Sequence, residues 1–153
     1  MESSKTNFIK QYEPDVESSI WIERSPQVIW NYLADVSNEP QWREIMIAAR
    51  WVSEPPYGVG STGLNVVKGV GDWPWKVMEW EEPHSVIWVV TGGRFGGSLA
   101  GYHVAPENAG SLVTLHAQFK SSTFMRFVMP YIRRRMSRQF AAELANLKAI
   151  LEA

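Results

Sequence analysis

Residues 121–153 read SSTFMRFVMPYIRRRMSRQFAAELANLKAILEA, and this stretch decides the fold class. Its large apolar side chains recur at steps of three and four, which places them on one face of a helix. The face consists of Met129, Ile132, Met136, Phe140, Leu144, Leu147 and Leu151. Burial of each such side chain contributes about 1.5–3 kcal/mol, so the face predicts a broad apolar surface beneath it. The charged residues expected to lie largely off this face are Arg133, Arg134, Arg138, Glu143 and Lys148.

The beginning of this helix carries two local signals. Ser122 or Thr123 supplies a hydroxyl that can cap the first turn. Pro130 follows several residues later, where it removes a backbone donor and predicts a kink or a division of the helix.

The surface that the helix needs is predicted upstream, where the apolar period changes to two. Six strands are expected, at residues 45–53, 62–70, 75–81, 85–91, 97–105 and 111–119. Their short connections, including a hairpin turn at 107–110, favour an antiparallel meander. In the last strand, Val113, Leu115, Ala117 and Phe119 share the face on which the helix should lie.

The N-terminal part predicts one more strand and two short helices. Residues 1–15 are polar and are expected to form a flexible lead-in, followed by a strand at 16–23. Ser25 and Pro26 are typical of a helix start, and that helix should end near Asp35. A second helix at 40–44 carries Trp42. The chain is therefore predicted to be a single domain over residues 16–153.

Composition excludes several classes of function. The 153 residues carry a net charge of −1, so no overall field recruits nucleic acid or an anionic membrane. The absence of cysteine excludes disulfides, thiolate nucleophiles and zinc–thiolate sites. No apolar run is long enough for integral membrane association and the first residues have no signal-peptide profile, so a cytoplasmic protein is expected. The eight tryptophans can fill a core or line a cavity.

The charge is uneven along the chain. From Lys120 to Lys148 there are seven Lys and Arg residues and one acid, Glu143. This segment is either a solvated helix face or a surface for an acidic partner or for the anionic head group of a ligand.

The order of elements and three short stretches carry a resemblance to a known family. The stretches are SPQVIW at 25–30, LAD at 33–35 and PQW at 40–42, and the turn at Glu82-Pro83 and the segment 110–114 agree with them. Residues 16–152 thereby resemble the START / Bet v 1-like (SRPBCC) superfamily, most closely its polyketide cyclase/dehydrase branch. The resemblance implies an α+β helix-grip fold, in which a curved seven-stranded antiparallel sheet wraps around the C-terminal helix and leaves a cavity. That superfamily includes lipid carriers, hormone receptors and aromatase/cyclases, so the resemblance does not decide the chemistry.

The resemblance also implies where a ligand would enter and what it would touch. The mouth should be rimmed by the loops at 71–74 and 92–97 and by residues 124–128, and the glycines around Arg94 and Phe95 form either a gate or a plain loop. The residues expected to contact a ligand are Trp42, Trp73, Trp75, Trp88, Phe95, Tyr102, Phe124, Val128, Ile132 and Met136. For the tryptophans, filling of the core is the alternative interpretation.

Signals for catalysis are few. The hydroxyl of Tyr102 is expected to point inward, and Arg94 at the mouth can hold a carboxylate or remain a free surface residue. Glu79 lies on a strand whose alternation fits burial, which would make it an acid/base group, and also fits exposure. His84, His103 and His116 have no metal-ligand spacing, and no metal or other cofactor is implied.

Three functions follow as hypotheses. The first is binding of a small, largely apolar lipid, aromatic or polyketide-like molecule in the cavity. The second is a polyketide cyclase, aromatase or dehydrase activity that uses Tyr102, Glu79 and Arg94. The third is a protein-interaction domain that uses the basic part of the last helix. The sequence leaves open whether the protein is a monomer or a homodimer.

Overall fold

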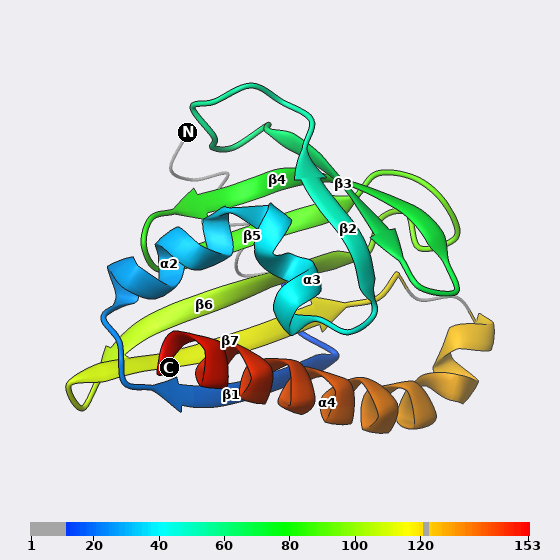
Figure 1. The fold of residues 1–153 in the computed structure, drawn as a ribbon. Helices are drawn as coiled ribbons and strands as arrows, with labels where there is room; N and C mark the ends of the chain where they lie inside the picture. The colour runs from blue at the N-terminus through cyan, green and yellow to red at the C-terminus, as the bar shows by residue number, and fades with distance from the viewer. Residues whose placement is uncertain (1–11, 121–122) are drawn as a thin grey trace.

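The computed structural model describes residues 12–120 and 123–153 and has the predicted helix-grip architecture, with one curved sheet folded around the C-terminal helix (Figure 1). The elements are β1 (Val16–Ile22), α2 (Pro26–Ala34), η1 (Val36–Asn38), α3 (Glu39–Trp42), β2 (Met46–Trp51), β3 (Thr62–Val67), β4 (Gly71–Glu81), β5 (Ser85–Val90), β6 (Leu99–Glu107), β7 (Gly110–Gln118) and α4 (Thr123–Leu151). All neighbouring strands are antiparallel, in the order β1-β7-β6-β5-β4-β3-β2. Helix α4 crosses the concave face beside β1 and β7, and α2 and α3 cover the other end of that face.

The start of α2 follows from its cap. The Oγ of Ser25 accepts a hydrogen bond of 3.4 Å from the amide of Val28, and Pro26 occupies the first turn, where no donor is lost. The buried residues Ile29, Trp30 and Leu33 then fix this helix on the sheet. The sequence prediction for this helix is confirmed.

The β6–β7 hairpin forms where the turn sequence predicts it. Asn108 and Ala109 both adopt positive φ, 46° and 61°, which is the geometry of a tight two-residue hairpin turn. On the concave face of β7, Val113, Leu115 and Ala117 are buried, as the alternation predicts.

Helix α4 begins at Thr123, and Ser122 lies outside the described residues. Pro130 is inside the helix, and Figure 1 shows the first turns bent away from the remainder. The predicted apolar face is buried at Met129, Phe140, Leu144 and Leu147.

One expectation about α4 is wrong. Glu143 does not lie off the buried face, because only 2% of the residue is exposed. It is buried since Arg43, from the chain segment before β2, forms an ion pair of 3.0 Å with it.

The boundary between β3 and β4 also differs from the prediction. Residues 71–74 were expected to be a rim loop, but they are the first residues of β4, paired with β3. The turn is shorter, since Gly69 adopts a φ of 79° that reverses the chain within three residues. Pro74 lacks a backbone donor, and its carbonyl accepts a hydrogen bond of 2.9 Å from the amide of Thr91.

The convex face of the sheet receives part of the N-terminal segment. Residues 1–11 of the predicted lead-in lie outside the described residues, whereas Tyr12 and Asp15 contact β7. The hydroxyl of Tyr12 lies 2.6 Å from Nδ1 of His116, and this histidine is thereby buried on the convex side of β7. In the described part of the chain, no helix is long and apolar enough to cross a membrane.

Candidate functional site

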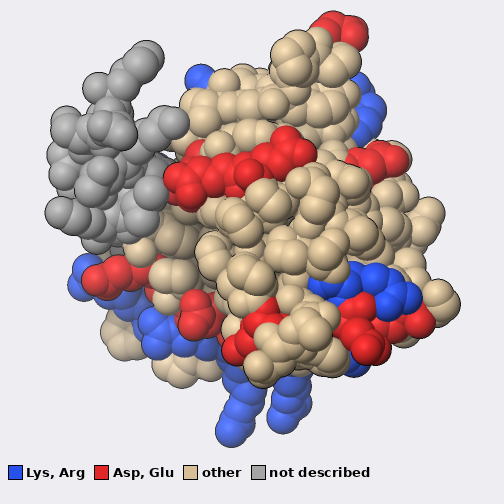
Figure 2. All heavy atoms as spheres, turned by 90° about the vertical axis from the view of Figure 1, so that its left-hand side faces the viewer, with Lys and Arg blue, Asp and Glu red and all other residues tan. Residues whose placement is uncertain are grey.

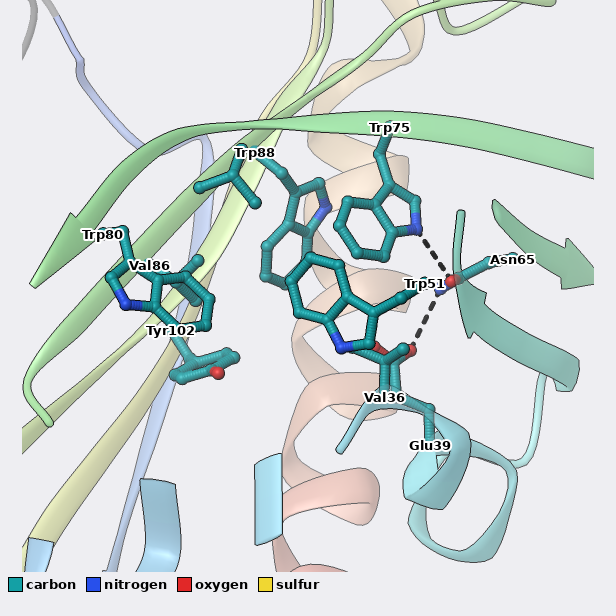
Figure 3. A pocket seen from close by; sticks show the side chains of 10 residues that line it. Val36, Glu39, Trp51, Asn65, Trp75, Trp80, Val86, Trp88 and Tyr102 are labelled. Carbon is teal, nitrogen blue, oxygen red and sulfur yellow. Dashed lines mark hydrogen bonds between the residues drawn. The ribbon is translucent and has the colours of Figure 1, made fainter. Parts of the chain in front are cut away.

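Two hollows lie between the concave face of the sheet and the helices. The first holds about 20 Å³, enough for about one water molecule, and the second about 90 Å³. The residues around the first are Val36, Glu39, Trp51, Asn65, Trp75, Val77, Trp80, Val86, Trp88 and Tyr102 (Figure 3). Asn65 and Trp88 line both hollows, so the two hollows adjoin at these residues.

Aromatic rings form most of the wall of the first hollow. Trp75 lies edge-on to Trp51, with ring centroids 5.0 Å apart, and 6.1 Å from Trp88. Trp88 in turn meets Tyr102 edge-on at 6.0 Å. Edge-to-face contacts of this kind stabilise a rigid wall while leaving ring faces and edges directed at the hollow.

The position of Trp75 depends on a glycine. A Cβ added at Gly63, on the neighbouring strand β3, would overlap the indole ring of Trp75. The absence of a side chain at Gly63 therefore lets this ring lie flat across β3 and reach Asn65.

A polar group closes one side of the aromatic wall. The indole Nε1 of Trp75 donates to Oδ1 of Asn65 at 2.9 Å, and Nδ2 of Asn65 donates to Oε2 of Glu39 at 3.0 Å (Figure 3). Glu39 is the first residue of α3 and is 7% exposed. A carboxyl group thus lies at the edge of an apolar hollow.

The charge of Glu39 is connected to a buried network. Nη1 of Arg43 lies 3.6 Å from Oε2 of Glu39, while its Nε donates at 3.0 Å to Oε2 of Glu143. Gln139 donates to the other oxygen of Glu143 at 3.0 Å. One buried arginine therefore serves two buried carboxylates.

This environment acts on the acidity of Glu39. Burial raises the pKa of the Glu39 carboxyl, and the nearby Glu143 adds to the increase. The Arg43 guanidinium and the hydrogen bond from Asn65 oppose it. A carboxyl with a raised pKa can hold a proton in a pH range in which an exposed glutamate has lost it.

The second hollow is more apolar and is bounded by α4. Met136 and Phe140 form its helix side, and Trp73, Trp88 and Phe119 contribute aromatic rings from the sheet side. Its polar groups are those of Arg43, Asn65 and Ser98.

The structure brings part of the predicted ligand-binding set together. Trp75, Trp88 and Tyr102 line the first hollow, and Trp73, Trp88 and Met136 line the second. Phe95 contacts Trp73 at a ring distance of 5.1 Å and so lies beside the second hollow.

The other predicted contacts lie elsewhere. Trp42 is 3% exposed and packs in the core of the domain, with its ring 5.5 Å from the guanidinium of Arg43. Ile132 and Val128 are half-buried on α4, and Phe124 is exposed; none of the three lines either hollow.

Of the three predicted catalytic residues, one lines a hollow and two do not. Tyr102 lines the first hollow, and burial raises the pKa of its hydroxyl. Arg94 is exposed in the loop after β5 and lines neither hollow. Glu79 also lies outside both, where its Oε1 accepts a hydrogen bond of 2.7 Å from Ser85.

The orientation of Glu79 has a physical cause. The pairing of β4 with β5 shifts register between Val77 and Glu79, so strict alternation fails there. Trp80 takes the inward position in place of Glu79 and lines the first hollow.

Sequence reasoning missed Glu39, Asn65, Trp51 and Trp80. For Asn65 a signal existed, because the alternation of β3 places it on the same face as Gly63 and Val67, and this face is buried. For Glu39 none existed, since its partners Asn65 and Glu143 are distant in the sequence. Among the described residues, no group of three or more His, Asp or Glu is arranged to hold a metal ion.

The antiparallel sheet wrapped around α4, with hollows between them, defines a helix-grip protein. The profile of the family described as "Polyketide cyclase / dehydrase and lipid transport" matches residues 13–152, and the chain belongs to this family. The uncharacterized protein Rv1546 of Mycobacterium tuberculosis (strain ATCC 25618 / H37Rv) is 31% identical in an alignment of 110 positions that covers 67% of this chain and 74% of that protein.

Two solved structures show the same fold. TTHA0849 from Thermus thermophilus superimposes with a TM-score of 0.72 at 15% identity, over 89% of this chain and 95% of that one. The Aha1 dimer from Colwellia psychrerythraea gives a TM-score of 0.65 at 20% identity, over 90% and 95% of the two chains. At these identities the likeness concerns the fold alone.

Proposed function

We propose that this protein binds a small, flat, largely apolar molecule, aromatic, polyketide-like or lipid, in the two hollows between the sheet and α4. The observation that carries the proposal is the convergence of four tryptophans and Tyr102 on a hollow whose polar side is formed by Asn65 and Glu39. Aromatic walls with a few convergent polar groups are typical of sites for small molecules.

Each hollow is smaller than a ligand of the proposed kind, so binding requires the two hollows to be connected. Neither hollow alone accommodates more than a few atoms, but the two adjoin at Trp88 and Asn65. We expect a change in the side-chain conformation of Trp88 to connect the two hollows. The ligand then replaces contacts that Trp88 makes in the unliganded protein.

Native mass spectrometry of freshly purified protein, followed by solvent extraction, tests the proposal directly. A co-purifying apolar compound is the expected result, and titration with aromatic polyketide-like compounds should quench the tryptophan fluorescence. Trp75→Phe should weaken this binding, whereas Trp21→Phe, at a ring that packs against Lys148 on the outside of the fold, should not. A clean apo mass together with unchanged fluorescence would contradict the proposal.

Acid/base catalysis of the polyketide cyclase or dehydrase type is the second candidate. One observation favours it, namely that Glu39 and Tyr102 line the same hollow and that burial raises the pKa of both groups. Cyclisation of a poly-keto chain requires orientation and one or two proton-transfer groups, which these residues would supply. Tyr102→Phe should then abolish turnover of a poly-keto substrate but preserve its binding; unchanged turnover would remove Tyr102 from the mechanism.

The oligomeric state is proposed to be a monomer or a homodimer. The similar Aha1 structure from Colwellia psychrerythraea is described as a dimer. Light scattering over a range of protein concentrations distinguishes the two, and a larger assembly would contradict both.

A further inference from the structure

The N-terminal turns of α4 expose three large aromatic side chains. The exposed fractions are 73% for Phe124, 83% for Phe127 and 67% for Tyr131. Their spacing of three and four residues places them on one side of the helix. The opposite side of α4 faces the interior of the domain, where Met136 and Phe140 line the second hollow. The packing of the domain therefore gives no reason for three apolar rings at these positions.

A cluster of arginines continues the same side of the helix. Arg134, Arg135 and Arg138 follow Tyr131 at helical spacing, and all three are exposed. We call these three arginines and the three aromatic residues the outer face of α4. Figure 2 shows Lys and Arg side chains projecting from the lower edge of the molecule, where α4 runs in Figure 1.

The charge of this region is unbalanced. The sequence has no acid between Lys120 and Glu143, and Glu143 is buried. Within residues 12–120 and 123–153, no ion pair involves Arg134, Arg135 or Arg138, whereas Arg133 lies 3.6 Å from Asp15. Arg133 points to a different side of the helix from the outer face, so that the charges of the outer face are available to a partner.

We propose that the outer face of α4 docks on the surface of a bilayer that contains anionic lipids. Aromatic rings are favourable at the depth of the head groups, and arginines beside them bind lipid phosphates. An arginine near an anionic membrane surface contributes about a fivefold gain in binding. In this proposal α4 lies along the surface, with its aromatic rings at the depth of the head groups.

The charge also decides against a second copy of the chain as the occupant. A twofold-symmetric dimer through this face would bring Arg134, Arg135 and Arg138 of both protomers into one interface, and the helix has no acid before Glu143 to oppose them. Like charges at such an interface are unfavourable. An anionic surface satisfies the arginines and the aromatic rings at the same time.

Docking would also place the site of the proposed function next to the bilayer. The helix that touches the lipid carries Met136 and Phe140 on its inner side, at the second hollow. An apolar ligand could then pass between the membrane and the hollow around α4. This consequence rests on the proposed function, but docking itself does not.

Sedimentation with vesicles tests the inference on the full chain. Vesicles of phosphatidylcholine alone are compared with vesicles of phosphatidylcholine and phosphatidylglycerol, at low and at high salt. We expect binding to the anionic vesicles alone, weakened by salt. Combined replacement of Arg134, Arg135 and Arg138 by glutamine should lower the partition coefficient by about a hundredfold. Combined replacement of Phe124, Phe127 and Tyr131 by serine should lower it by about tenfold or more.

Matched controls use exposed residues on other parts of the surface. Ile47→Ser, Val52→Ser and Val59→Ser remove three exposed apolar side chains, and Arg50→Gln, Lys68→Gln and Lys76→Gln remove three exposed charges. Both control proteins should bind as the wild type does.

Three results would overturn the inference. The first is the absence of binding to anionic vesicles, and the second is equal binding by the wild type and both outer-face variants. The third is a concentration-dependent dimer that the aromatic variant abolishes, since that result assigns the outer face to a second copy.

Discussion

The indole nitrogen of Trp75 donates a hydrogen bond of 2.9 Å to the side-chain oxygen of Asn65, and this contact connects the aromatic wall to the buried charges. The amide nitrogen of the same asparagine donates to Glu39 at 3.0 Å. Both ends of the amide are thereby occupied, so its orientation is fixed. Asn65 therefore fixes the position of the Trp75 indole relative to the Glu39 carboxyl group.

Replacement of Asn65 by alanine should be costly. The substitution leaves the buried indole N–H of Trp75 without its acceptor and removes a donor from Glu39. We expect the free energy of unfolding in urea to fall by about 2–4 kcal/mol. The matched control is Asn31→Ala, at an exposed asparagine paired with Gln27 on the surface of α2, which should change it by less than about 0.5 kcal/mol. An equal loss in both variants would mean that the contact with Trp75 contributes nothing.

The raised pKa of Glu39 predicts a specific dependence of stability on pH. Above the ordinary value of 4.5 the unfolded chain loses this proton, while the folded protein retains it until its raised pKa is passed. The folded state therefore binds more protons in this interval, and the contribution of Glu39 to stability is lost as the pH rises. Relative to wild type, Glu39→Gln should become more stable as the pH increases from 4.5.

Urea unfolding at a series of pH values measures this difference. Glu54→Gln, at an exposed glutamate in the β2–β3 connection, is the matched control and should not reproduce the trend. If the difference between wild type and Glu39→Gln is constant with pH, burial does not disfavour the charge of Glu39.

Local periodicity predicted the parts of this fold that depend on neighbours in the sequence. The apolar face of α4, the cap of α2 at Ser25 and the hairpin turn at Asn108 were all predicted in their observed places. The family resemblance added the wrapping of the sheet around the C-terminal helix and the expectation of a cavity, and the match of the family profile over residues 13–152 confirms the resemblance.

The predictions that were wrong or missing concern residues whose positions depend on contacts distant in the sequence. Glu143 carries a charge at a helix position that periodicity alone allows to be exposed, and only its ion pair with Arg43 explains its burial. The shift of register beside Val77 turns Trp80 inward in place of Glu79, and no residue type in the sequence predicts such a shift. Glu39 became part of the site through Asn65, which β3 brings from a different region of the chain.

His116 predicts an effect of opposite sign at acid pH. Burial, with a smaller contribution from the charge of His103, lowers the pKa of His116 from 6.5 to about 4. Between these values the unfolded chain binds a proton that the folded protein does not, so stability is lost as the pH falls from 6.5 to 4. The loss from this group should reach about 2–3 kcal/mol. His116→Gln should reduce the slope of stability against pH in this interval, whereas His84→Gln should preserve it. An unchanged slope in the first variant would contradict the assignment.

Trp88 is the residue whose substitution should change the size of the site, because its indole ring is a wall shared by both hollows. In Trp88→Ala the two spaces become continuous, and the lost packing should lower the free energy of unfolding by about 2–4 kcal/mol. The larger space favours larger ligands, so the affinity for a three-ring hydroxyanthracene relative to phenol should rise by about tenfold, as measured by fluorescence titration. Trp73→Ala is the control, because Trp73 lines only the second hollow and its removal leaves the wall in place. If both variants change the relative affinity equally, the ligand occupies the second hollow alone and Trp88 does not control access to the first.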